Sequence, residues 1–112
     1  MFKLDQTESF YWPVEVNIPT DGGKHDKQTF DAQFKRVSQT RLQEMRQEIE
    51  DGKATDAGFV REVMVGWRGV TDRGTEVPFS ETTLAQLLDI PTVEASIVMA
   101  FVQANAGVIR KN

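Results

Sequence analysis

Cysteine is absent from this sequence, and histidine occurs only once. Without cysteine the chain has no disulfide framework, no thiolate metal site and no thiol nucleophile. No apolar run approaches the ~20 residues that a bilayer span needs, so we expect no membrane segment. The opening residues show no basic stretch followed by an apolar one, the pattern of a secretory signal. These absences favour a cytoplasm-like compartment.

Basic residues are fewer than acidic ones in this chain. Lys and Arg number 13 against 17 Asp and Glu, which gives a formal net charge of -4. The basic pairs Lys35-Arg36 and Arg110-Lys111 are isolated from each other. A nucleic-acid-binding surface usually gathers its basic side chains on one face. We therefore expect no nucleic-acid partner.

The residues that could carry chemistry are not arranged for it. His25 stands in a polar, glycine-rich stretch, which is typical of a solvated turn. The spacing of Gly66, Gly69 and Gly74 matches neither a dinucleotide fingerprint nor a P-loop. Ser80 has no histidine nearby in sequence, and its position fits a helix cap. We expect no catalytic residue, no cofactor site, no metal site and no enzymatic activity.

Apolar residues make up 39% of the 112 positions, which is enough for the core of one domain. A period-two pattern is followed by a helical one. This order predicts an α+β fold, with an N-terminal antiparallel β-hairpin followed by about four α-helices. We divide the single domain 1–112 into a loose arm (1–9), a hairpin (10–36), a helical part (38–107) and a basic tail (108–112).

The hairpin prediction comes from two alternating segments. Apolar and polar residues alternate from Trp12 to Ile18 and again from Phe30 to Phe34, as in strands with one buried face. Pro13 cannot donate to a ladder, and so it predicts an edge strand. Keeping every apolar side chain on one face predicts a loop centred on Gly23, with the pairs Val16–Phe30, Val14–Ala32 and Trp12–Phe34.

From Ser38 onward the apolar spacing becomes helical. Leu42, Met45 and Ile49 predict a first helix, and Gly52 is placed to end it in a left-handed cap. The carboxylates on this helix, such as Glu48, lie among arginines and indicate a solvated face.

A second helix is predicted to start at a cap on Thr55 or Asp56. It would run through Phe59, Val63 and Trp67, which form one i, i+4, i+8 stripe. Two glycines then break the pattern. We expect these apolar residues to belong to the core.

Two more helices follow. Ser80 is placed as the N-cap of the third, with Glu81 in the first turn, where negative charge favours the helix dipole. Asp89-Ile90-Pro91 ends that helix. Thr92 is placed to cap the last helix, and Gly107 is placed to end it.

The last helix is apolar over more than one face. A helix of this kind is either central in its fold or shared with a neighbour. We expect part of its surface to contact a partner or a second subunit, at Val98, Phe101 and Val102, together with the free edge of the hairpin. Its apolar positions are Val93, Ile97, Val98, Ala100, Phe101, Val102 and Ala104.

The segment from Phe59 to Phe101 resembles the short tail assembly chaperones of long-tailed bacteriophages. The tryptophan-bearing strand, the polar glycine turn and the second strand before it fit the same pattern. The features that carry the resemblance are Val65-Gly66-Trp67, Gly69-Val70, Asp72, Val77-Pro78-Phe79-Ser80, Leu84, Leu87-Leu88, Ile90-Pro91 and the final alanine-rich helix.

This resemblance implies a non-enzymatic protein that binds the phage tape-measure protein. It would keep the apolar helical segments of that protein soluble until the tail tube forms around them. The family further implies a homo-oligomer, location in the host cell cytoplasm and absence from the mature virion. It also implies a longer frameshifted form that contacts the tail tube protein, of which this chain would be the short counterpart.

Two other interpretations remain open. The protein could instead be a structural tail component, such as a tube or connector subunit retained in the virion. It could also be a small cytoplasmic regulatory binding module, although the charge distribution favours this less. Mass spectrometry of purified particles separates the first from a chaperone, and the neighbouring genes bear on both.

Overall fold

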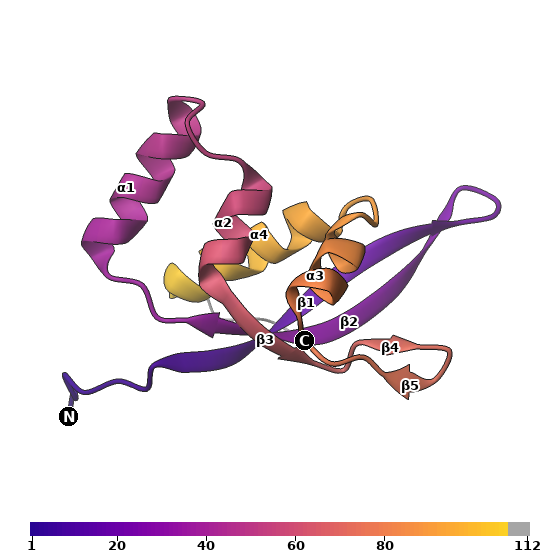
Figure 1. Ribbon diagram of the computed structural model, residues 1–112, viewed down its shortest axis with the longest axis horizontal. Coiled ribbons are helices and arrows are strands. Elements are labelled where there is room, and N and C mark those ends of the chain that lie inside the picture. Colours follow the sequence, from indigo (N-terminus) through magenta and orange to yellow (C-terminus); the bar gives the residue numbers. More distant parts are fainter. Residues whose placement is uncertain (108–112) are drawn as a thin grey trace.

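A long antiparallel hairpin forms the base of the protein, in a computed structural model that describes residues 1–107. Its strands are β1 (Ser9–Thr20) and β2 (Lys24–Lys35), joined by a tight turn (Figure 1). The predicted register was wrong by two residues. The observed pairs are Phe10–Phe34, Trp12–Ala32 and Val14–Phe30.

The turn explains the shift in register. Gly22 and Gly23 both take positive φ angles, 80° and 74°, so the chain reverses within Asp21-Gly22-Gly23 and Thr20 pairs with Lys24. The turn is therefore centred on Gly22, one residue before the predicted centre. A shift of two residues keeps each side chain on its face, because the side-chain period of a strand is two. The predicted apolar face was correct for this reason.

A third strand, β3 (Met64–Arg68), pairs antiparallel with β2 and completes a sheet of order β1-β2-β3. The prediction that the second helix runs to Trp67 was wrong, since α2 (Asp56–Val63) ends at Val63. Glycine inside a helix costs about 1 kcal/mol. In the strand Gly66 lies beside Gln33 on β2, whose Oε1 atom would have to move to admit a Cβ atom.

The first three helices begin at side-chain caps, of which Thr55 and Ser80 were predicted. Ser38 accepts a hydrogen bond at the start of α1 (Gln39–Glu50), and Thr55 does so for α2. Gly52 follows α1 with φ of 71°, as a left-handed cap requires. After a two-strand hairpin, β4 (Thr71–Asp72) and β5 (Thr75–Glu76), comes α3 (Glu81–Leu88). There Ser80 and Thr83 form a reciprocal capping box.

The last helix, α4 (Val93–Asn105), begins differently from the prediction. Thr92 occupies the N-cap position with φ of 75°, and its side chain accepts no capping hydrogen bond. Its hydroxyl instead donates to the carbonyl oxygen of Asn17 on β1, at 3.4 Å. Thr92 therefore ties α4 to the sheet. Gly107 follows the helix with φ of 71°.

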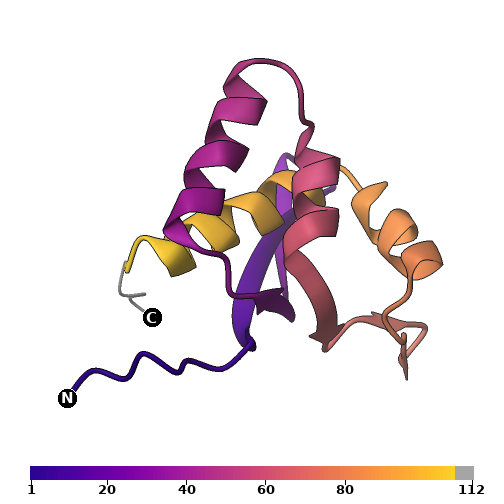
Figure 2. The same cartoon turned by 60° about the vertical axis from the view of Figure 1, so that its left-hand side comes forward.

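The helices gather on one face of the sheet, and α4 crosses that face over β1 (Figures 1 and 2). Phe101 of α4 is 1% exposed, and its ring meets those of Phe34 on β2 and Phe59 on α2 at centroid distances of 5.1 and 5.3 Å. Burying one such ring contributes about 2–3 kcal/mol. The predicted α+β fold, with an N-terminal hairpin and four helices within residues 1–107, is confirmed.

Candidate functional site

The outer face of α4 carries a line of exposed apolar side chains. Val93, Ile97, Ala100 and Phe101 are buried against the sheet. On the opposite side of the helix lie Ala95, Met99, Val102 and Ala106, which we name the α4 ridge. Met99 is 61% exposed and Val102 54%. A surface helix normally places polar residues opposite its core face, and this one does not.

The spacing of the α4 ridge is typical of a helix-packing seam. Its residues follow one another by four, three and four positions, the interval at which apolar side chains line one side of a helix. The polar residues of α4 lie on its flanks, so no charge interrupts the ridge. These residues are Glu94, Ser96, Gln103 and Asn105.

Beside the α4 ridge is an apolar groove, which we name the α1–α4 groove. Its volume is about 330 Å³. Its apolar walls come from three helices, α1, α2 and α4. They are Leu42, Ile49, Phe59, Val98, Phe101 and Val102, and polar side chains at the rim are Gln39, Gln43, Arg46 and Asn105.

All three residues singled out from the sequence line this groove. Phe101 is buried and forms its floor, Val98 is half-buried in its wall, and Val102 is shared with the α4 ridge. Sequence reasoning missed Met99, although a helical wheel places this residue opposite the buried Ile97. It also missed the α1 wall, because the packing of α1 beside α4 is a tertiary contact.

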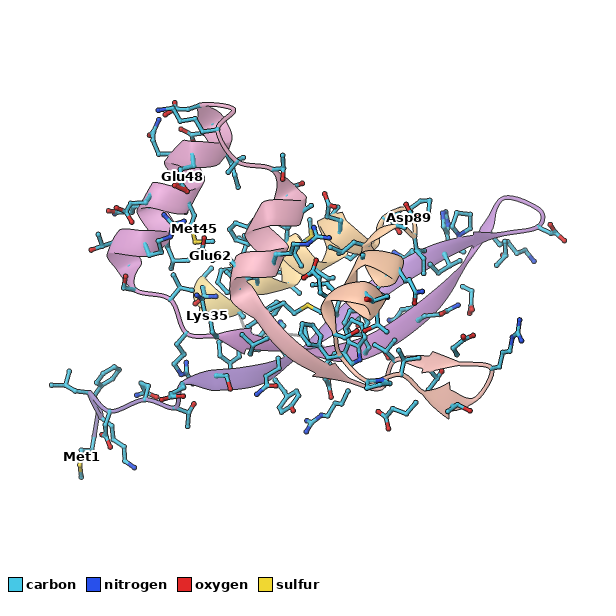
Figure 3. The ribbon with its side chains drawn as sticks, in the orientation of Figure 1. Met1, Lys35, Met45, Glu48, Glu62 and Asp89 are labelled. Carbon is cyan, nitrogen blue, oxygen red and sulfur yellow. The ribbon has the colours of Figure 1, made fainter. Side chains whose placement is uncertain are left out.

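An ion cluster holds α1 against α2 and so shapes the groove. The guanidinium of Arg41 donates two hydrogen bonds to the carboxylate of Glu62, at 2.7 and 2.8 Å, and two to that of Glu48, both at 3.2 Å. In Figure 3, Met45 and Glu48 of α1 face Glu62 of α2. Glu48, expected on a solvated face, is thus half-buried and paired.

The hydrogen bonds of this cluster shift the pKa values of its side chains. The hydrogen bonds from Arg41 hold the pKa of Glu62 below its usual range, against an opposing effect of burial, and Lys35 adds a smaller effect in the same direction as Arg41. The hydrogen bonds to Glu62, and to a smaller extent those to Glu48, raise the pKa of Arg41 above its usual value. Both groups therefore carry charge at neutral pH, and the bidentate pair keeps its geometry.

The free edge of the hairpin is poorly suited to pairing with another strand. Backbone N–H groups of a strand point alternately to the two sides, and a proline within a ladder must occupy a position that faces the free side. Pro13 and Pro19 of β1 therefore remove two donors from that edge. The Asn17 carbonyl on the same side accepts the Thr92 hydroxyl. Such an edge resists strand addition.

Within residues 1–107, no three His, Cys, Asp or Glu side chains are grouped so that they could hold a metal ion. No single helix there has the length and apolar content of a membrane span. Helices α3 and α4 have that length and apolar content only when they are counted as one segment, and a bend of 103° separates them.

A family model described as phage tail assembly chaperone matches residues 1–112. No curated protein and no solved structure matches the chain.

Proposed function

The chain belongs to the phage tail assembly chaperones, and we propose that it binds apolar helical segments of the tape-measure protein and keeps them soluble during tail assembly. The observation that carries this proposal is the α4 ridge. A helix that is apolar on its inner and its outer face needs a second layer over the outer one. We infer that the protein works by binding and without catalysis, as members of this family generally do.

The α4 ridge has the shape for a helical partner. Its 4-3-4 spacing lets the side chains of a second helix pack between its own. The two alanines leave room for close approach at the ends of the ridge. Met99 is flexible and polarisable, so it adapts to partners of varied sequence. A tape-measure protein offers many such segments, and the ridge suits all of them loosely.

Self-association completes the proposed mechanism. One ridge covers only three turns of a partner helix, so a single contact is weak. Several linked copies gain affinity because the second contact is intramolecular. We propose a homo-oligomer that acts in the host cytoplasm and leaves before the virion is finished, with a longer frameshifted form contacting the tail tube protein.

Co-expression with an apolar helical segment of the tape-measure protein from the same phage tests this function. The wild-type chain should raise the soluble fraction of that segment, and Met99→Asp should abolish most of the gain, because it places a charge in the centre of the ridge. Gln103→Asp adds the same charge on the flank of α4 and serves as the matched control. Equal solubilisation by both variants would show that the ridge is not the binding surface.

Mass spectrometry of purified phage particles addresses the main alternative. A chaperone should be absent from them, or present far below one copy per particle. Detection at the abundance of a tail subunit would favour a structural component and overturn this part of the proposal.

A further inference from the structure

Three apolar side chains near the N-terminus, those of Met1, Phe2 and Leu4, are left uncovered by their own chain. Because β1 begins at Ser9, the arm in the structure comprises residues 1–8. Met1 and Leu4 are essentially fully exposed, and Phe2 is 83% exposed. Exposed apolar side chains of this size, grouped within four residues, indicate a binding segment. Asp5 follows them directly.

The arm is anchored at its base and free at its end. The carbonyl oxygen of Glu8 accepts a hydrogen bond from the Arg36 backbone N–H at 2.9 Å. The guanidinium of Arg36 also donates to the Thr7 hydroxyl, at 3.3 and 3.4 Å. These bonds direct the chain beyond the end of the sheet, and Figure 3 shows Met1 far from the helices. Phe2 and Leu4 are exposed on this arm, and neither lines the groove of its own chain.

The α1–α4 groove matches these side chains in size and polarity. An apolar cavity of about 150 Å³ already accommodates benzene. The groove, at about 330 Å³, therefore has room for a phenylalanine ring and a leucine side chain. In the single copy the arm bends at Leu4, where Gln6 donates hydrogen bonds to the carbonyl oxygens of Lys3 and Leu4. Docking would extend this segment, and in an extended segment Phe2 and Leu4 point to the same side, so both can enter together.

The charges at the rim of the groove also fit the arm as its occupant. The Arg46 side chain stands at the edge of the groove and makes no ion pair or hydrogen bond with any described residue. Asp5 also has no such partner among residues 1–107. With Phe2 and Leu4 in the groove, Asp5 lies next in the chain, where it can face a cation on the rim.

We propose that the arm of one copy docks Phe2 and Leu4 into the α1–α4 groove of a second copy, with Asp5 facing Arg46. This inference rests on the self-association proposed above and names the contact that produces it. The contact joins two different surfaces, an arm and a groove, so two copies that exchange arms form it twice. It also covers the apolar groove while leaving Met99 of the ridge open for a partner helix.

Sedimentation velocity over a range of concentrations provides the first test. Phe2→Ser/Leu4→Ser should weaken self-association by about ten-fold or more, since two apolar anchors are lost. Lys3→Ser changes the same segment without touching the anchors, and it should associate like the wild type. If the wild type is monomeric at millimolar concentration, both self-association and this contact are wrong. If it associates and Phe2→Ser/Leu4→Ser associates equally, only the arm contact is wrong.

A mixing experiment tests whether the groove of one copy binds the arm of another. Val102→Asp puts a charge in the groove wall but keeps its arm, whereas Phe2→Ser/Leu4→Ser keeps its groove but loses the arm. Each should be mainly monomeric alone, and the mixture should form a one-to-one complex. Absence of that complex would overturn the proposal.

Charge reversal tests the rim. Arg46→Glu and Asp5→Lys should each weaken association about two- to five-fold, the range of an exposed ion pair. The double variant should recover most of the loss. Additive losses in the double variant would exclude the pairing of Asp5 with Arg46.

Discussion

The two tryptophans differ in how their indole N–H groups are satisfied. Trp67 Nε1 donates to the carbonyl oxygen of Val77 at 2.7 Å, and its ring meets Phe79 edge-on at 5.0 Å. Trp12 Nε1 is buried and has no hydrogen-bond partner within residues 1–107. A buried donor without a partner is unfavourable, whereas a satisfied one contributes to stability. The same substitution should therefore have different consequences at the two positions.

Trp67→Phe is expected to lower the free energy of unfolding more than Trp12→Phe does, by about 1–2 kcal/mol. The first change removes a hydrogen bond and leaves the Val77 carbonyl without its partner. The second removes a donor that had none, and so it partly offsets the loss of ring area. Urea denaturation of both variants and the wild type measures the difference. Equal losses would mean that the Trp67 bond contributes nothing net.

Local residue roles were predictable from the sequence, and long-range ones were not. Ser80 was identified as a cap from its place before the helical pattern, and its partner in the structure, Thr83, lies only three residues away. The bond of Trp67 to Val77 spans a strand and a small hairpin, and that of Thr92 to Asn17 joins residues 75 positions apart. Neither leaves a mark in the local pattern, so sequence reasoning gave Trp67 only a general place in the core.

At the scale of elements, β3 shows where periodicity misleads. Phe59, Val63 and Trp67 fit a helical stripe, yet the chain leaves the helix after Val63. Both β2 and β3 bury apolar residues on the helix side of the sheet, and the edge of β2 that faces away from β1 needs hydrogen-bond partners. That requirement arises only once the hairpin exists. A short apolar run beside a glycine could not decide between the two structures.

The cluster that joins α1 to α2 should make stability depend on pH. Because hydrogen bonds from Arg41 depress the folded pKa of Glu62, its stabilisation is complete above the unfolded value of about 4.3. It is lost as the pH falls through the folded pKa, where the carboxyl becomes protonated in both states.

Glu62→Gln is therefore expected to lower the Tm by about 2–5 °C at pH 7 and by less at pH 3. Glu44→Gln is the control, because Glu44 is 59% exposed and lies 3.5 Å from Arg41 at its nearest. It should change the Tm little at either pH. Thermal unfolding followed by circular dichroism gives both values. A deficit of Glu62→Gln that persisted undiminished at pH 3 would show that the loss is one of packing.

For the whole molecule, the main consequence is that two apolar surfaces meet at one residue. Val102 belongs to the α4 ridge and also to the wall of the α1–α4 groove. The sequence indicated that α4 has more apolar surface than one face can bury. It could not show which residues belong to the ridge and which to the groove, because the groove exists only where α1 packs beside α4. Phe101 illustrates the point, since the fold makes it the floor of the groove and leaves it 1% exposed.

Val102→Asp should accordingly impair two functions while leaving the fold intact. The side chain is 54% exposed, so a carboxylate there remains hydrated in the monomer, and the change in unfolding free energy should stay within about 0.5 kcal/mol. Self-association and solubilisation of a tape-measure segment should both fall about ten-fold, because the charge would be buried in either contact. Met99→Asp should affect only solubilisation, and Gln103→Asp neither.

Light scattering and co-expression measure the two functions, and circular dichroism reports the fold. Unfolding of Val102→Asp would place Val102 in the core, and the loss of only one function would mean that the ridge and the groove do not share it.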